Sequence, residues 1–380
     1  MTMSVRVSLG NVIRHRSEFI EIDDFEVYKR CRVQVNTKGI ILRDKVKGIE
    51  IKTKRQQVCK AGEFLVAEID AKMGGFGIVP PELDGAIVSS HYFLYEVDES
   101  VLDAKYLGFY IRTSDFIDQV QAQGSTNYAA IRPHDVLEYT IPLPPLEEQR
   151  RIVARIEALA TKIEEAQKLR QETNEDCERL LSSAYREISE GAEVRLMGEI
   201  APLVRRPVEV NPFGNYSELG VRSFGKGTFH KPTLTGADIG DKRIFEIQEG
   251  DLVFQIVFAW EGAVAVARPE DHGRVGSHRF LTCVPKEGIA KASYLCLHFL
   301  SPQGLEQLGT ASPGGAGRNR TLGLKALADI PVSVPTYEKQ LWLNDLVKKV
   351  ELIKKTREES SKEEEILLPI ILNKAFKSEL

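Results

Sequence analysis

Two polar loops carry side chains whose types and spacing suit recognition of nucleic acid. Arg and Lys neutralise phosphates, while Arg, Asn, Ser and Thr can hydrogen-bond to base edges. Each loop also holds glycine, which lets the backbone approach a ligand closely. The candidate DNA contacts are Ser125, Thr126, Asn127 and Arg132 in the first loop and Arg318, Asn319 and Arg320 in the second. Ordinary surface turns are the alternative explanation.

A second set of candidate DNA contacts consists mainly of basic side chains. Its members are Lys38 and Arg43 in the first half and Arg222, Lys226, His230 and Lys231 in the second. For this set the alternative is a solvated hairpin. His91 and His278 occupy matching positions in strand-like runs, where a structural role competes with base contact.

The motifs of catalysis and cofactor binding are incomplete in this sequence. Residues 220–226 almost spell a phosphate-binding loop, but Gly227 stands where the magnesium-binding Ser or Thr is required. Residues 211–213, Asn-Pro-Phe, resemble an amino-methyltransferase motif without its second proline. Residues 68–72 place carboxylates near a lysine, as in a metal-dependent nuclease, yet the matching segment of the second half is apolar there. We therefore predict no catalytic residues and no bound cofactor.

The sequence predicts neither a metal site nor a membrane-spanning helix. The five cysteines form no C-x-x-C pair, and the seven histidines form neither an H-E-x-x-H motif nor a cluster with zinc spacing. No stretch reaches the ~20 consecutive apolar residues of a membrane-spanning helix. The opening residues lack the apolar core of a signal peptide. We expect reduced thiols, no metal site and a cytoplasmic protein.

The charges of the chain are segregated. The 380 residues carry a net charge of -4, which by itself argues against a nucleic-acid partner. Residues 29–60, however, contain eleven Lys or Arg against Asp44 and Glu50, whereas residues 147–190 contain eight basic and eleven acidic groups. A basic globular segment is compatible with phosphate binding even when acidic helices dominate the total.

The chain repeats itself once. Residues 90–94 (SHYFL) match residues 277–281 (SHRFL), and the offset stays between 187 and 189 through the globular segments. Beyond the prolines that follow, the offset becomes 191. The pairs at this offset include Gln149 with Gln340 and Tyr185 with Phe376. Two tandem copies of one plan are predicted: a globular segment, a proline-rich exit and a helix.

Each globular segment is predicted to be a mixed α/β (α+β) domain. Short apolar runs bounded by Gly, Pro, Asn and Asp predict strands at residues 63–67, 251–258 and 262–267. Amphipathic spacing predicts short helices within residues 106–120 and 292–308. Prolines make residues 141–145 and 330–335 extended exits.

A long helix is predicted from residue 147 to residue 190. Apolar residues recur there at intervals of three and four, in a nearly heptad seam. At 1.5 Å per residue this helix would extend ~66 Å, and its apolar stripe needs a partner. The aligned residues Leu343, Val347 and Val350 begin a second helix, which Pro369 should kink or restart. The constant offset favours pairing of the two helices over attachment to separate cores.

The predicted organisation has four parts. They are a first domain at residues 1–145, a central long helix at 146–190, a second domain at 191–335 and a C-terminal long helix at 336–380.

The sequence and its arrangement resemble those of a known protein family. Residues 141–153, IPLPPLEEQRRIV, resemble the junction between target-recognition domain and long helix in specificity subunits of type I restriction-modification enzymes. Residues 219–227, 250–253 and 276–278 resemble recurring features of their recognition domains. Residues 260–262, Trp-Glu-Gly, do so as well, and the first half departs from this pattern with Met73-Gly-Gly. The resemblance covers essentially the whole chain.

The resemblance implies a protein without catalysis of its own. Two pseudo-symmetric recognition domains would each read one part of a split double-stranded DNA sequence. The helices would form an antiparallel coiled coil that fixes the half-site spacing. Methyltransferase (M) subunits, usually two, would dock near the helices and bring S-adenosylmethionine, and restriction (R) subunits would bring ATP-driven translocation and cleavage.

Two other function classes stay open at this point. A coiled-coil scaffold with two protein-binding domains is the main alternative, and it would lack the steep salt dependence of phosphate binding. An autonomous nuclease or methyltransferase is the third hypothesis, which magnesium- or S-adenosylmethionine-dependent activity of the chain alone would support.

Overall fold

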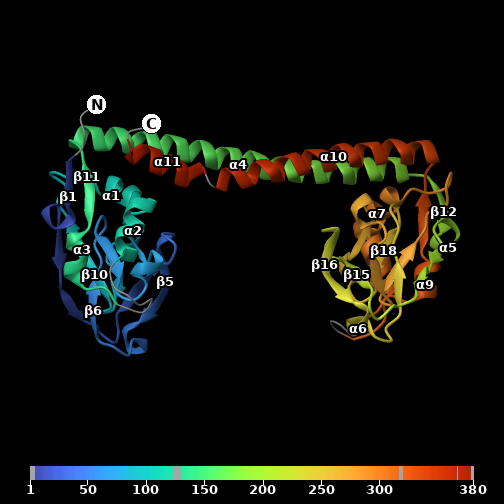
Figure 1. The fold of residues 1–380 in the computed structure, drawn as a ribbon, viewed down its shortest axis with the longest axis horizontal. Coiled ribbons are helices and arrows are strands. Elements are labelled where there is room, and N and C mark those ends of the chain that lie inside the picture. The colour runs from blue at the N-terminus through green and yellow to red at the C-terminus, as the bar shows by residue number, and fades with distance from the viewer. Residues whose placement is uncertain (1–4, 123–129, 316–319, 366, 378–380) are drawn as a thin grey trace. The chain divides into compact units, whose positions relative to one another are not determined.

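The chain folds into two compact units that each contain one sheet-rich domain (Figure 1). The computed structural model describes residues 5–122, 130–315, 320–365 and 367–377. The first unit comprises residues 1–168 and 359–380, and the second comprises residues 169–358. Two tandem domains of mixed α+β structure, joined by a long helix, confirm the predicted fold class.

The first domain is built from three sheets. Its strands are β1 (Val5–Ser8), β2 (Ile13–Arg16), β3 (Phe19–Glu21), β4 (Val27–Gln34), β5 (Gly39–Lys47), β6 (Arg55–Val58), β7 (Phe64–Ala67), β8 (Phe76–Ile78), β9 (Ile87–Val88), β10 (Tyr92–Val97) and β11 (Thr140–Leu143). The strand orders are β2-β10-β7-β8, β3-β6-β9-β4-β5 and β1-β11. All pairs are antiparallel except β4 with β9.

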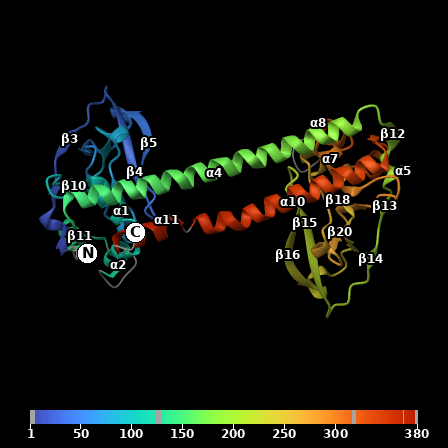
Figure 2. The same ribbon diagram turned by 90° about the horizontal axis from the view of Figure 1, so that it is seen from above.

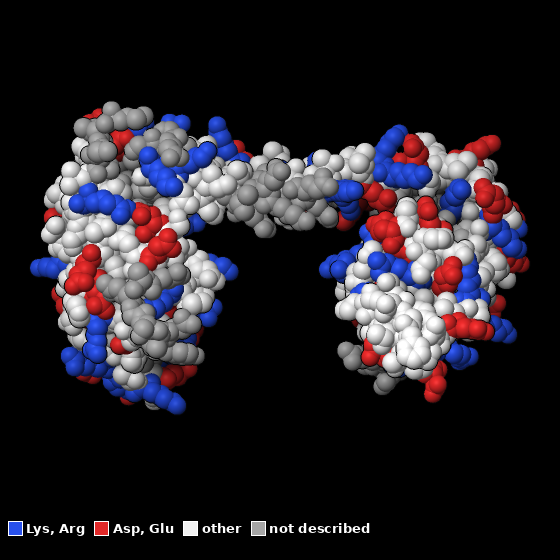
Figure 3. Space-filling view, in the orientation of Figure 1, with Lys and Arg blue, Asp and Glu red and all other residues white. Residues whose placement is uncertain are grey.

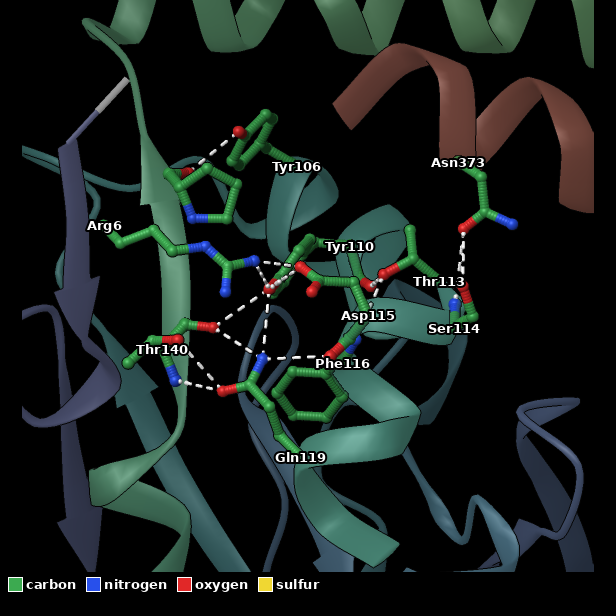
Figure 4. A network of polar contacts seen from close by, with 11 residues as sticks. Arg6, Tyr106, Tyr110, Thr113, Ser114, Asp115, Phe116, Gln119, Thr140 and Asn373 are labelled. Atoms are coloured by element: carbon green, nitrogen blue, oxygen red, sulfur yellow. Dashed lines mark hydrogen bonds and ion pairs between the residues drawn. The ribbon is translucent and has the colours of Figure 1, made fainter. Parts of the chain in front are cut away.

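Three short helices cover the first domain: α1 (Ala104–Tyr110), α2 (Ser114–Ala122) and α3 (Pro133–Glu138). A polar network around the Tyr110 hydroxyl ties α1 and α2 to the β1-β11 sheet (Figure 4). This hydroxyl donates to Asp115 Oδ2 at 2.7 Å and accepts from Arg6 Nη2 at 3.1 Å. The Gln119 side chain accepts from the backbone N–H of Thr140 at 2.7 Å. Residues from both ends of the domain are thereby held together.

The second domain repeats the first, element by element. Its strands are β12 (Glu193–Leu196), β13 (Leu203–Val204), β14 (Pro207–Val208), β15 (Asn215–Val221), β16 (Thr228–Thr235), β17 (Ile244–Glu246), β18 (Leu252–Gln255), β19 (Val264–Val266), β20 (Val275–Ser277), β21 (Phe280–Cys283) and β22 (Pro331–Val334). Its helices are α5 (Met197–Ile200), α6 (Gly236–Ile239), α7 (Ala292–Leu300), α8 (Pro302–Thr310) and α9 (Leu324–Ala328). The orders β13-β21-β18-β19, β14-β17-β20-β15-β16 and β12-β22 match those of the first domain.

Two local predictions differ in detail from the structure. The strand predicted at residues 251–258 ends at Gln255, because the chain turns there into a 3₁₀ turn at Ala259–Glu261. The proline-rich exits are the short strands β11 and β22, each of which pairs with one neighbour only. An edge position tolerates proline, which has no N–H to donate to a second neighbour.

The long helix α4 spans Leu146–Ser189, in agreement with its prediction from the sequence. The second helical segment consists of α10 (Tyr337–Glu365) and α11 (Leu367–Phe376) (Figure 2). Pro369 lies within α11. Residue 366, between α10 and α11, lies outside the described residues, so the kink or restart expected at Pro369 stays a prediction.

Each unit pairs one part of α4 with one part of the second helical segment. In the first unit, Ile156 of α4 is buried with Leu372 and Ala375 of α11. In the second unit, Glu178 of α4 lies 3.2 Å from Lys354 of α10. Later residues of α4 are thus matched with earlier residues of α10 and α11, which is the antiparallel direction.

Aromatic rings dock the ends of these helices on the domains. Phe376 of α11 lies 4.9 Å from Tyr106 and 5.2 Å from Tyr110, measured between ring centroids. Tyr185 of α4 packs likewise on α7, with centroids 5.5 Å from Tyr294 and 6.1 Å from His298. Tyr185 and Phe376, which the sequence aligns at an offset of 191, therefore make equivalent contacts in the two units.

Neither a membrane span nor a metal cluster is found in the part of the chain that the structure describes. No helix there is both long and apolar enough to cross a bilayer. No group of three or more His, Cys, Asp or Glu side chains there could hold a metal ion.

Candidate nucleic-acid interface

A β-hairpin projects from the five-stranded sheet of each domain. The β4-β5 hairpin turns through residues 35–38, and the β15-β16 hairpin turns through residues 222–227. Both turns contain left-handed residues, including Asn36 (φ 58°) and Phe224 (φ 62°). No helix follows residues 220–226, so the incomplete phosphate-binding motif is a hairpin turn.

The hairpin turns are anchored on equivalent 3₁₀ turns. In the first domain, Asn36 N donates to Met73 O at 2.6 Å and Thr37 N donates to Gly74 O at 3.0 Å. In the second domain, the matching bonds run from Phe224 N to Glu261 O at 2.8 Å and from Gly225 N to Gly262 O at 3.0 Å. Gly74 and Gly262 end their turns at φ 75° and 76°, a conformation that favours glycine.

These bonds correct one detail of the sequence alignment. Met73 matches Glu261, and Lys72 matches Trp260, whereas the sequence comparison had placed Met73 opposite Trp260. The sequence comparison is shifted by one residue, because it paired Gly75 with Gly262, whereas Gly74 is the true equivalent of Gly262. The two domains thus present Lys72 and Trp260 at the same place.

The chain that follows each polar loop returns to the same surface. Ile131 N donates to Glu68 O at 3.2 Å, and Leu322 N donates to Ile256 O at 2.9 Å. Each polar loop therefore ends beside the strand that leads into the 3₁₀ turn. Ser125, Thr126, Asn127, Arg318 and Asn319 lie outside the described residues.

Arg132 and Arg320 are the two described residues of the first candidate set. Arg132 is exposed, immediately before α3. The Arg320 guanidinium carbon lies 4.7 Å from the ring centroid of Trp260, and its Nη2 donates to Gly309 O at 2.8 Å. Arg320 therefore closes the end of α8 and lies on an aromatic ring, with further N–H groups able to serve a ligand.

The second candidate set divides into two groups. Lys38, Arg222 and Lys226 are exposed at or next to the hairpin turns, and Arg222 lies over the Phe229 ring at 4.8 Å. The others face carboxylates of their own domain: Arg43 at 3.6 Å from Asp44, His230 at 2.8 Å from Asp271, and Lys231 at 3.5 Å from Glu218.

Asp271 shows why His230 is firmly held. Burial alone would raise the pKa of this carboxyl. Hydrogen bonds from the Arg268 backbone, the Thr228 hydroxyl, the Arg268 side chain and His230 outweigh burial and lower its pKa to about 2. A carboxylate that is fully ionised at neutral pH keeps its four donors in place.

Sequence reasoning missed a pocket beside the second-domain loops. It has a volume of about 420 Å³ and is lined by Gln255, Ile256, Val257, Phe258, His278, Arg279 and Thr321. His278 and Arg279 are exposed in the turn between β20 and β21, not within a strand as expected. The repeated Ser-His-x-Phe-Leu motif at residues 277–281 was the available signal for this site.

The first domain differs in side chains at the same place. His91 Nδ1 lies 2.7 Å from Glu68 Oε2, whereas the residue equivalent to Glu68 is Ile256. His91 itself stands where the second domain has Arg279, because Glu68 N donates to His91 O at 2.9 Å and Ile256 N donates to Arg279 O at 3.0 Å. The match of His91 with His278 expected from the sequence is therefore wrong by one residue. Lys and Arg are interspersed with Asp and Glu on the visible face of each domain (Figure 3). The two surfaces thus share a backbone and differ in the groups that they present.

Comparison with known proteins identifies the domain. Residues 15–174 match the family described as the type I restriction modification DNA specificity domain. None of the curated proteins gives a significant match to the chain.

Solved structures extend the comparison to the whole length. The HsdS subunit from Thermoanaerobacter tengcongensis is 23% identical, with a TM-score of 0.60, over 99% of this chain and 97% of that chain. A chain from a structure that addresses complex assembly and conformational transition of the type I R-M system is 24% identical, with a TM-score of 0.68, over 99% and 98%. Residues 15–174 therefore match the model of the type I restriction modification DNA specificity domain, and the chain as a whole has the fold seen in the HsdS subunit structure.

Proposed function

We propose that this chain is the DNA sequence-specificity subunit of a type I restriction-modification complex. Each domain reads one half of a bipartite double-stranded target, with residues 1–145 and 191–335 as target-recognition domains. The long helices at 146–190 and 336–380 act as the spacer. The site of action is the cytoplasm, where the chromosome of a restriction-modification host lies.

One observation supports this proposal above the others. The two surfaces have the same backbone hydrogen bonds but different side chains. The first domain has Lys72, Met73 and Glu68 where the second domain has Trp260, Glu261 and Ile256. Reading of two different half-sites requires two domains with the same backbone and different exposed side chains. A scaffold that bound one protein twice would favour the same groups on both surfaces.

The candidate DNA contacts are proposed in three groups. The loop residues Ser125, Thr126, Asn127, Arg132, Arg318, Asn319 and Arg320, joined by Gln255, His278 and Arg279, are the proposed base-reading set. Lys38, Arg222 and Lys226 are exposed cations near these loops and suit phosphate contact. Arg43, His230 and Lys231 are the weakest candidates, because each already faces a carboxylate.

Exposed apolar side chains on the helices support docking of partner subunits. In the second unit, Leu169 and Leu180 of α4 are 63% and 50% exposed, and Trp342 and Leu352 of α10 are 53% and 65% exposed. Such residues mark protein interfaces when they lie on one element. The chain itself performs no catalysis in this proposal: methyltransferase subunits, two in number, bring S-adenosylmethionine, and restriction subunits bring ATP-driven cleavage.

Binding of the purified chain to random duplex DNA at 50 to 200 mM salt tests the DNA-reading proposal. Phosphate neutralisation predicts a linear fall of log affinity with log salt concentration, by ~10³-fold or more across this range for six contacts. Lys226→Ala should reduce the slope, while Lys349→Ala on α10 is the matched control. A flat salt dependence would favour the scaffold alternative.

A further inference from the structure

Two phenylalanines protrude from equivalent turns of the two domains. Phe25 is 92% exposed and Phe213 is 95% exposed, and 188 residues separate them, which is the offset of the repeat. An exposed phenyl ring contributes nothing to the core of its own domain. Its presence in both copies therefore calls for a role outside the fold.

Both turns are constructed from the same parts. Asp23 Oδ1 accepts from Phe25 N at 2.8 Å, and Asn211 Oδ1 accepts from Phe213 N at 3.0 Å. A tyrosine hydroxyl secures each turn from the following strand. The bonds run from Asp23 N to the Tyr28 hydroxyl at 3.0 Å and from Asn211 N to the Tyr216 hydroxyl at 2.8 Å.

A glycine packs closely beneath each turn. A Cβ atom at Gly48 would lie 1.8 Å from Asp23 O, and one at Gly236 would lie 1.9 Å from Asn211 O. Any side chain at either position would displace the turn. The two rings are thus held on rigid supports, which reduces the entropy lost when they bind a partner.

Local charge argues against DNA as the partner of these rings. Residues 21–26 contain Glu21, Asp23, Asp24 and Glu26 and no basic residue. Only Glu209 is charged among residues 207–216. Lys54 lies against the first turn, but its ammonium is paired with Asp24. Neither turn therefore carries a cation of its own to neutralise a phosphate.

The position of the rings points the same way. Phe213 precedes β15, and the candidate interface follows β15 at residues 222–227, so the seven residues of the strand separate them by roughly 23 Å. Val27 and Ile49, which are 61% and 68% exposed, extend the apolar surface near Phe25. The surround of Phe25, which is apolar and acidic, suits a protein pocket with a basic rim.

We propose that Phe25 and Phe213 are docking residues for a protein that this chain binds twice, and that this protein is the methyltransferase subunit of the same restriction-modification system. Each ring inserts into a phenyl-sized apolar pocket of one methyltransferase copy. This proposal rests on the proposed function, because it assigns the contact of a partner named there.

The test uses the full-length chain and the methyltransferase subunit encoded with it. Affinity is measured by titration for the wild type, Phe25→Ser, Phe213→Ser and the double variant. Each single change should weaken binding of one methyltransferase copy about tenfold or more, and the double variant should lose both high-affinity events. Val5→Ser, which removes a similarly exposed side chain from β1, should change nothing. Melting temperatures should stay constant, since none of these side chains is buried.

Two results would overturn the proposal. Unchanged methyltransferase affinity of the double variant would exclude a docking role. Lost DNA affinity of the free double variant, with unchanged methyltransferase affinity, would make the rings DNA contacts instead. Failure of the proposed function gives a different result, because the wild-type chain itself would then bind neither the methyltransferase subunit nor duplex DNA.

Discussion

Gln340 makes the same three hydrogen bonds as Gln149, 191 residues earlier. The Gln149 side chain accepts from Asp103 N and donates to Val101 O and Pro144 O, each at 2.8 Å. The Gln340 side chain accepts from Lys291 N and donates to Ile289 O and Pro335 O, each at 2.9 Å. Both amides are completely buried. Each fastens the first turns of a long helix to the domain beside it.

Gln149→Leu should therefore destabilise the protein strongly. The substitution leaves a buried N–H and two buried carbonyls without partners, at a cost of roughly 2 to 4 kcal/mol in the free energy of unfolding. Urea denaturation followed by circular dichroism measures this loss. Gln340→Leu should give a similar loss in the second unit, and Gln171→Leu, at an exposed position of α4, is the control. A loss below roughly 0.5 kcal/mol for either buried glutamine would contradict the assigned role.

Removing the carboxylate of the buried ion pair should destabilise the first domain more than the second. Arg16 and Glu63 are both 4% exposed and lie 2.5 Å apart (Nε to Oε1). Glu63→Ala leaves a buried cation alone and should cost roughly 3 to 5 kcal/mol. The matching pair of the second domain, Arg206 with Asp251, has its arginine 22% exposed, so Asp251→Ala should cost less.

A double substitution separates charge burial from packing. Arg16→Met with Glu63→Leu should recover most of the stability that Glu63→Ala loses, because no uncompensated charge remains. Chemical denaturation of the wild type, Arg16→Met, Glu63→Leu and the double variant forms a double-mutant cycle. Equal losses for the single and double variants would show that packing, not the unpaired charge, sets the cost.

The stability of the second unit should fall in mild acid. Burial lowers the pKa of His298 from 6.5 to about 4, and this ring lies between Tyr185 of α4 and Gln307 of α8. Between these pKa values the unfolded chain binds a proton that the folded chain does not. The stabilisation is therefore complete above pH 6.5 and is lost as pH falls toward 4, by roughly 3 kcal/mol over the window.

Denaturation of the wild type and of His298→Gln at several pH values measures this effect. The difference between the two proteins should shrink steadily as the pH falls from 7 to 4. A difference that stays constant over that window would mean that His298 does not titrate in this way.

The two DNA surfaces should act on different half-sites. Arg279→Ala should reduce affinity for the cognate target by about 1 to 3 kcal/mol and relax discrimination at one base pair of one half-site, and Arg132→Ala should do the same in the other half. Binding of a set of single-base-pair variants of the target gives the pattern. Loss of equal size for every sequence would assign the arginine to the phosphate backbone.

Repetition made much of the fold predictable from the sequence. The offset of 191 paired Gln149 with Gln340 and Tyr185 with Phe376, and each pair has equivalent contacts in the structure. The heptad-like seam located α4 to within one residue at each end. Such periodic, buried patterns are readable because burial constrains every member of the set.

The candidate interface was less predictable, since few of its members are constrained by packing. The end of β18 at Gln255 and the shift that sets Met73 opposite Glu261 both depend on turn hydrogen bonds that no apolar pattern records. The pocket near Arg279 is formed by three separate segments, which only the folded sheet brings together.

Methylation mapping tests the central claim most directly. Modified bases are located across the genome of cells that carry the wild-type gene, a deletion of it, or the Arg279→Ala variant. The account predicts a gapped two-part motif that is methylated only when the chain is present, with altered preference in a single half of the motif for the variant. A methylation pattern that is the same with and without the chain would contradict the account.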